Sequence, residues 1–167
     1  MLNVKSKNLR NGSLLIESIV GISIAITGMI GIFGLLSRSL AINKDLTQKF
    51  IATYLSAEGV EVVKSLIDSN VANGNIWNAG LSAGNYELSY DSLALFSSVT
   101  GQSTTPLLFD ESSGAYNYLD GRVTPFKRTI KISEPSSDEM KIVSDVEWAE
   151  RSLNKKVSLE DHFFNWR

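Results

Sequence analysis

A long uncharged run near the N-terminus constrains this chain more than any other feature. Leu14 to Leu36 are 23 consecutive residues, and Glu17 is the only charged residue among them. A helix of this length crosses a hydrocarbon core of about 30 Å. One ionisable group inside such a span costs roughly 2.5 to 3.5 kcal/mol to insert, so Glu17 is a functional candidate by default.

Length and composition limit the other possibilities. A chain of 167 residues has room for one apolar segment and one small domain. Three basic residues, Lys5, Lys7 and Arg10, precede Ser13, and without residues 1–12 the chain keeps 13 basic against 18 acidic side chains. This acidity argues against nucleic acid as a partner bound by bulk charge. The chain has no cysteine, which excludes disulfides, thiol catalysis and cysteine metal sites.

The order of signals at the N-terminus differs from that of a secretory signal peptide. Such a peptide carries a small-residue cleavage site after its apolar region, whereas here Gly12 comes before the apolar run. An ordinary signal-anchor explains the basic residues and the apolar span by the positive-inside rule, with residues 1–12 in the cytoplasm. It does not explain Glu17.

The segment Gly12-Ser-Leu-Leu-Ile-Glu17 resembles the processing segment of the type IV prepilin family, which includes the pseudopilins of type II secretion. The resemblance implies that a prepilin peptidase/methyltransferase cleaves after Gly12 and that Ser13 becomes the methylated N-terminus. It also implies that Glu17 is the acid that pairs with this amine and sets the register between subunits. Ser13 and Leu14 stand where the family usually has phenylalanine and threonine.

We expect one long helix over residues 13–68, with 13–36 spanning the membrane. No proline interrupts this stretch, and after Arg38 apolar and small residues recur at steps of three and four. The predicted buried stripe consists of Leu35, Ser39, Ile42, Leu46, Phe50, Thr53, Ala57, Val60 and Ile67, with Val63 or Lys64 between the last two. Glu58, Glu61 and Lys64 are predicted to form a solvated face. A coiled coil is the competing interpretation, which the short and irregular stripe disfavours.

Residues 69–167 are predicted to form a β-rich head. Tyr86, Leu88 and Tyr90 alternate with polar residues, and residues 107–109 are expected to pair with 115–118 across a turn. Three antiparallel strands are then predicted, with their apolar faces under helix residues 46–67. The first places Arg128 on the apolar face with Phe126, Ile130 and Ile132; the others alternate at Met140, Ile142, Val146 and Trp148, and at Val157, Leu159 and Phe163.

Three segments of this region resemble the final strands of V-type minor pilins and I-type minor pseudopilins. They are Phe126-Lys-Arg-Thr-Ile130, Val146-Glu-Trp148 and Phe163-Phe-Asn-Trp166. The fold expected from the resemblance is α+β and pilin-like, a transmembrane-then-amphipathic helix packed on an antiparallel sheet. With no disulfide available, cohesion falls to the helix–sheet core, and Trp148 is a candidate anchor of it.

Other candidate sites are weaker. His162 is the sole histidine, so a Ser-His-Asp triad would have to use it, and a solvated histidine is the simpler interpretation. Asp110, Glu111 and Asp120 lie in predicted turns and offer oxygen ligands for calcium, without EF-hand spacing. We expect no catalytic residue, no cofactor, no metal site and no enzymatic activity.

The sequence therefore predicts a minor pilin or pseudopilin that assembles into a type IV pilus-like filament. The implied partners are the prepilin peptidase/methyltransferase, other pilin subunits, an inner-membrane assembly platform and, before assembly, membrane lipid. The implied location is the cytoplasmic membrane, with the head extracytoplasmic, followed by a pilus or a periplasm-spanning pseudopilus. The alternative from another class is a single-pass membrane-anchored binding module that is never polymerised. Within the family, pilus, type II secretion and competence (DNA-uptake) roles all stay open.

Overall fold

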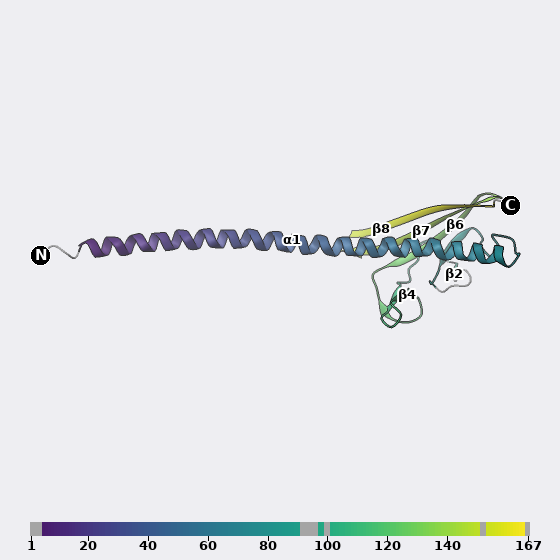
Figure 1. Ribbon diagram of the computed structural model, residues 1–167, viewed down its shortest axis with the longest axis horizontal. Coiled ribbons are helices and arrows are strands. Elements are labelled where there is room, and N and C mark those ends of the chain that lie inside the picture. The colour runs from purple at the N-terminus through teal and green to yellow at the C-terminus, as the bar shows by residue number, and fades with distance from the viewer. Residues whose placement is uncertain (1–4, 91–96, 99–100, 151–152, 166–167) are drawn as a thin grey trace. The chain divides into compact units, whose positions relative to one another are not determined.

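The computed structural model describes residues 5–90, 97–98, 101–150 and 153–165, and the side chains from Gly12 onward within them except those of 97–98. Residues 1–4 of the predicted leader and Trp166 lie outside these ranges. The order of elements is one long helix followed by strands (Figure 1). The α+β layout expected from the sequence, a long apolar N-terminal helix and then an antiparallel sheet, is therefore confirmed.

The helix α1 runs over Lys5–Ala72, so it extends beyond both ends of the predicted 13–68. It ends in a turn where Gly74 adopts φ +73°, a backbone conformation that glycine tolerates best. The chain divides into two compact units, Met1–Thr47 and Gln48–Arg167. The second unit therefore contains the last part of α1 together with all the strands.

The second unit holds a five-stranded antiparallel sheet in the order β2-β1-β6-β7-β8. Its strands are β1 (Gly84–Glu87), β2 (Ser97–Ser98), β6 (Lys127–Ser136), β7 (Glu139–Glu150) and β8 (Leu153–Phe164). A second sheet, in the order β4-β3-β5, consists of β3 (Leu108–Asp110), β4 (Ala115–Asn117) and β5 (Arg122–Val123). The predicted hairpin between 107–109 and 115–118 and the three final strands are thus confirmed within a residue or a few. Tyr90, expected in the first strand, lies outside β1 and is exposed.

The core lies between α1 and one face of the larger sheet. One cluster joins α1 residues Val60, Val63 and Ile67 to β6 and β7, and a second joins Ala52 and Leu55 to Phe126, Val146 and Trp148. The Trp148 ring is buried and lies 6.0 Å from that of Phe126. The expectation that Trp148 anchors the helix–sheet core agrees with this position.

The face of α1 that packs on the sheet differs from the predicted stripe. Val60, Val63 and Ile67 are buried as expected, but Leu46, Phe50, Thr53 and Ala57 are exposed. In their place the helix buries Ala52, Leu55, Ser56, Gly59 and Val62. Small residues such as Ser56 and Gly59 lie at the centre of this face because the helix approaches the sheet closely. A Cβ added at Gly59 would lie 2.6 Å from Ile130 Cδ1 and from Ser144 Oγ. The Ser56 hydroxyl also donates to the Ser144 carbonyl at 2.7 Å.

A buried cation crosslinks the helix to the sheet. The Arg128 side chain is 0% exposed, and its Nη1 donates to the Leu55 carbonyl at 2.9 Å and to Glu58 Oε1 at 2.8 Å. Its Nη2 donates to the Leu88 carbonyl, just beyond β1. The prediction that Glu58 belongs to a solvated face is therefore wrong, because its carboxylate neutralises this guanidinium. Glu61 and Lys64 are exposed, as predicted, and Lys64 Nζ lies 3.7 Å from Glu61 Oε1.

We expect Arg128→Met to lower the free energy of unfolding of the second unit by about 3 to 5 kcal/mol, because it leaves Glu58 and two carbonyls without their donor. Glu58→Gln should have a smaller effect, since that side chain is 32% exposed. Urea unfolding followed by tryptophan fluorescence measures both. Lys64→Met, which breaks only an exposed pair, is the control and should change stability by about 0.5 kcal/mol or less. A loss at Arg128 no larger than the control's would contradict the crosslink.

Candidate functional site

The predicted processing segment lies within α1. Gly12, Ser13 and Glu17 are all helical and exposed. Residues four apart lie on the same helical face, so Ser13 and Glu17 are neighbours one turn apart. Glu17 makes no ion pair with any described residue. Its charge is therefore unsatisfied within the part of the chain that the structure describes.

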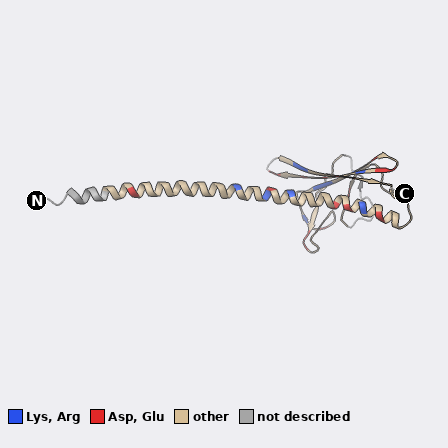
Figure 2. Cartoon of the chain, turned by 45° about the horizontal axis from the view of Figure 1, so that its top comes forward, with Lys and Arg blue, Asp and Glu red and all other residues tan. Residues whose placement is uncertain are grey.

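The apolar run around Glu17 is exposed throughout. Every large apolar side chain from Leu14 to Leu36 keeps between 52% and 73% of its surface accessible. α1 is long and apolar enough to cross a membrane, and Figure 2 shows that Glu17 is isolated among uncharged residues between Leu14 and Leu36. A continuous apolar surface of this extent is not stable in water and needs lipid or protein to cover it.

The polar atoms within the run are satisfied by the helix itself. Ser18 Oγ donates to the Leu14 carbonyl at 2.8 Å, Ser23 Oγ to Ile19 at 2.7 Å, and Thr27 Oγ1 to Ser23 at 2.8 Å. These bonds remove the hydroxyl donors from any competition for water. Glu17 is then the one strongly polar side chain in the run.

Four glycines punctuate the same run. A Cβ added at Gly21, Gly28, Gly31 or Gly34 would meet nothing within 4 Å. Each glycine weakens a helix by up to about 1 kcal/mol relative to alanine, and no contact inside the described chain accounts for that loss. Gly59, on the same helix, differs because the sheet fills the space beside it. The exposed glycines allow another helix to approach closely.

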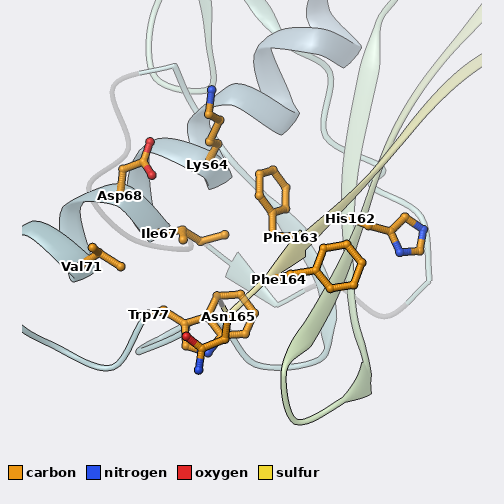
Figure 3. A pocket seen from close by; sticks show the side chains of 9 residues that line it. All are labelled: Lys64, Ile67, Asp68, Val71, Trp77, His162, Phe163, Phe164 and Asn165. Carbon is orange, nitrogen blue, oxygen red and sulfur yellow. The ribbon is translucent and has the colours of Figure 1, made fainter. Parts of the chain in front are cut away.

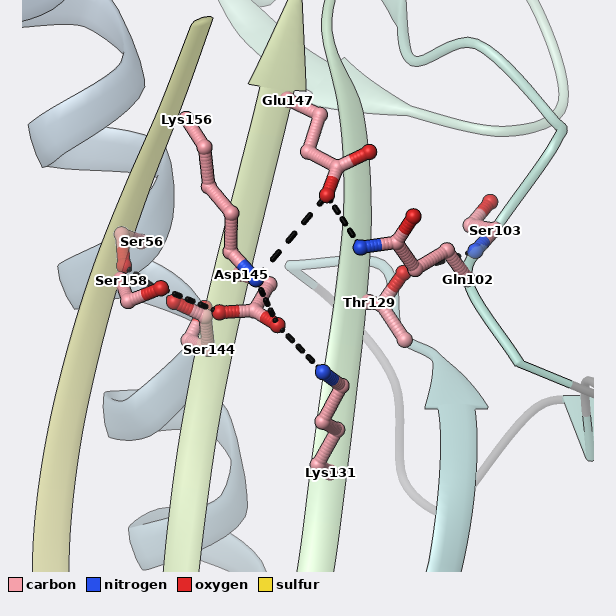
Figure 4. Close-up of polar contacts among 10 residues, drawn as sticks. All are labelled: Ser56, Gln102, Ser103, Thr129, Lys131, Ser144, Asp145, Glu147, Lys156 and Ser158. Atoms are coloured by element: carbon pink, nitrogen blue, oxygen red, sulfur yellow. Dashed lines mark hydrogen bonds and ion pairs between the residues drawn. The ribbon is translucent and has the colours of Figure 1, made fainter.

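The polar face of the larger sheet, opposite α1, carries a buried acid that the sequence did not single out. Asp145 is 2% exposed and accepts hydrogen bonds from Lys131 Nζ and Lys156 Nζ, each at 2.7 Å, and from Ser158 Oγ (Figure 4). Burial opposes its ionisation, but these hydrogen bonds prevail and lower the pKa of Asp145. The carboxylate thus joins three strands through three hydrogen bonds, a structural role. In the sequence, Asp145 lies among the polar residues that alternate with the apolar ones of β7, so nothing indicated that its side chain would be buried.

His162 lies at the exposed end of β8. Its Nδ1 is 2.6 Å from Glu139 Oε1 and its Nε2 is 3.1 Å from Glu160 Oε1. These two hydrogen bonds raise the pKa of His162 above its ordinary value. Neither nitrogen faces a serine hydroxyl in the described contacts. The arrangement is that of a solvated ion-pair cluster.

The acids considered for calcium are bound within their own turns. The Asp110 carboxylate accepts from the Ser113 and Ser112 hydroxyls at 2.7 and 2.8 Å, which lowers the pKa of Asp110 to about 2. Glu111 faces Arg122 at 3.7 Å, and Asp120 Oδ1 accepts from the Gly121 backbone N–H at 2.8 Å. Among the described residues, no group of three or more metal-ligating side chains is placed to hold an ion.

One groove of about 500 Å³ opens beside the C-terminal end of α1 (Figure 3). Ile67, Val71 and Trp77 form part of its wall, and Phe163 and Asn165 contribute from the end of β8. Lys64 and Asp68 line it from the helix. His162 also lines the groove, but its ring nitrogens contact Glu139 and Glu160, and the apolar part of the wall can accommodate an apolar group.

No family model, no curated protein and no solved structure matches this chain. The residues themselves are therefore the basis of any functional conclusion, and the candidate site is the exposed apolar segment of α1 with Glu17 at its start.

We expect His162 to titrate above about 6.5, the usual histidine pKa, because both ring nitrogens contact glutamates. A pKa raised in the folded state means that the stabilisation is complete below the unfolded pKa and is lost as pH rises through the folded pKa. The stability difference between wild type and His162→Gln should therefore be larger at about pH 5 than at about pH 8.5. NMR titration of this sole histidine gives the pKa directly, and a difference independent of pH would contradict the cluster.

Proposed function

We propose that this chain is a structural subunit of a type IV pilus-like filament, a minor pilin or pseudopilin, and that a prepilin peptidase removes residues 1–12. The observation that carries the proposal is the segment from Gly12 to Glu17 at the head of an exposed apolar helix. Processing and assembly of this kind account for the basic leader, the glycine, the acid five residues later and the apolar span. The function is assembly, and catalysis has no part in it.

Cleavage after Gly12 would make Ser13 the first residue of α1. Its amine, methylated or free, is cationic, and Glu17 follows within about one helical turn. A carboxylate in the first turn also complements the partial positive charge at a helix N-terminus. Removal of the leader thus converts an unsatisfied acid into one member of an ion pair, either within one subunit or between two. In low-dielectric surroundings such a pair is strong when it is well formed, and it favours one axial register.

The exposed surface of α1 supports the same function. Before assembly, lipid of the cytoplasmic membrane covers the apolar residues, with the β-rich unit on the extracytoplasmic side. During assembly, the helices of neighbouring subunits replace the lipid, and Gly21, Gly28, Gly31 and Gly34 let them approach closely. Neither step requires a catalytic group. Pilus, type II secretion and competence filaments all use a subunit of this kind.

The processing step is tested by the intact mass of the membrane-extracted protein, expressed with and without a prepilin peptidase. With the peptidase, we expect the loss of residues 1–12 and the gain of one methyl group on Ser13. Gly12→Val should keep its leader under the same conditions, and an alanine substitution at the neighbouring Asn11 serves as a matched control that should still be cleaved. An intact leader in every sample would support the single-pass binding module instead.

The role of Glu17 is tested separately from cleavage. We expect Glu17→Gln to be cleaved like wild type but to reach the sheared filament fraction about tenfold less, because the buried amine of Ser13 loses its counter-charge. Glu61→Gln, at an exposed carboxylate of the same helix, should assemble normally. Quantitative immunoblots of membrane and filament fractions measure both. Equal incorporation of the two variants would exclude Glu17 from assembly.

A further inference from the structure

The strand β8 is a long open edge of the larger sheet. It pairs with β7 over twelve consecutive residue pairs, from Leu153 opposite Glu150 to Phe164 opposite Glu139, without a register shift. Its other side has no partner strand among the described residues. The opposite edge of the sheet is β2, which has only two residues. Natural proteins usually protect an edge as long as β8 with a proline, a bulge or unpaired lysines.

The protections expected at such an edge are weak here. β8 contains no proline and its pairing with β7 contains no bulge. Its two lysines turn inward: Lys155 Nζ lies 2.7 Å from Glu150, and Lys156 Nζ lies 2.7 Å from Asp145 (Figure 4). Leu159 keeps 40% of its surface exposed although it points to the helix side of the sheet. The edge therefore presents backbone and apolar groups with few unpaired charges.

The hydrogen bonds identify which backbone groups point outward. The His162 N–H donates to the Asp161 carboxylate at 2.9 Å, so it does not point at β7, whereas the Asn165 N–H donates to the Asp138 carbonyl next to β7. Because backbone direction alternates along a strand, the even-numbered residues from Asn154 to His162 direct their N–H and C=O groups to the open side.

We propose that β8 pairs antiparallel with β8 of a second copy of this chain, about a two-fold axis at Ser158. In this register the outward-pointing backbone groups of one strand face those of the other, because both members of each such pair have even numbers. Side chains of opposite charge also meet, although both lysines keep their contacts within the chain: Lys156, which contacts Asp145, faces Glu160 of the second copy, and Lys155, which contacts Glu150, faces Asp161. On the helix side, Val157 faces Leu159 of the second copy and covers its exposed surface.

The neighbouring registers lack this complementarity. Moving one strand by two residues in either direction places Lys155 opposite Leu159 or opposite Phe163, so the ion pair is lost. Moving it by one residue sets outward-pointing backbone against inward-pointing backbone and exchanges the two faces. Opposite charges across a strand pair stabilise it and like charges destabilise it, so the order of charges along β8 selects one register. The two-fold pairing uses both open edges, so the assembly stops at a dimer.

This inference does not depend on the proposed function, because β8 belongs to the β-rich unit whether or not the leader is removed. The test uses the full chain in detergent micelles and two variants, Lys155→Asp and Asp161→Lys. Each variant alone sets like charges against each other twice, and we expect its dimer to be at least about tenfold weaker in sedimentation equilibrium. Mixing the two variants restores opposite charges at both positions, so the mixed dimer should regain wild-type strength.

Association through the apolar part of α1 would be unaffected by these substitutions and is thereby distinguished. Recovery on mixing also shows that the variants are folded. Equal association of wild type and both single variants, failure of the mixture to recover, or a wild type that stays monomeric would overturn the proposal. A monomeric wild type would indicate instead that an extended segment of a different protein pairs with β8.

The register is tested by a single cysteine, since the chain has none of its own. Residues facing each other in a hydrogen-bonded antiparallel pair have Cα atoms about 5.5 Å apart, within disulfide range. We expect Ser158→Cys to crosslink under mild oxidation at least about tenfold faster than Ser136→Cys, an exposed position on β6. Equal rates for the two variants would exclude the two-fold axis at Ser158.

Discussion

The second unit depends on one buried cation. Arg128 has no exposed surface, yet it reaches the Leu55 carbonyl and Glu58 on α1 and the Leu88 carbonyl beyond β1. A guanidinium offers five donors in a fixed plane, which is why one side chain can join elements that are far apart in sequence. Tyr118 adds to this junction by donating from its hydroxyl to the Arg128 carbonyl at 3.2 Å, and burial raises the pKa of that phenol to about 12. In a chain without disulfides, this junction fixes the helix over the sheet.

Small residues make that junction possible. The guanidinium reaches α1 only because Gly59 and Ser56 let the helix lie close to β6 and β7. A larger residue at Gly59 would move the helix away from the sheet and lengthen every bond that Arg128 makes to it. The other contacts of the helix are apolar and include Val60, Val63 and Ile67. They add buried apolar area but do not determine the orientation of the helix. Close approach determines orientation here, and hydrophobic burial determines how strongly it is held.

The difference between close approach and hydrophobic burial also explains which parts of the fold could be predicted from the sequence. The period-two alternation of β6 and β7 identified the residues that face α1, Arg128 included, because α1 covers that face of β7 and the first part of β6. The helical face could not be chosen in the same way: α1 carries apolar residues all round, and Phe50 has more apolar surface than Gly59. Asp145 was missed because its burial depends on lysines from two neighbouring strands, which no pattern within β7 reveals. The candidate site, Gly12, Ser13 and Glu17, was predicted from a local signal in the sequence, and it stays a prediction.

The two parts of α1 use glycine and apolar residues for opposite purposes, and this contrast supports the proposed function. From Gln48 onward, glycine is justified by the sheet that fills the space beside it, and apolar residues are buried within the same chain. From Leu14 to Leu36, glycines border open space and apolar side chains stay exposed. A helix that keeps such residues without an internal reason is complementary to something outside the chain. Lipid satisfies the apolar side chains but gives no reason for glycine, whereas a neighbouring helix accounts for both. Glu17 agrees with the same conclusion, because a carboxylate is retained in an apolar surface only where a counter-charge can reach it.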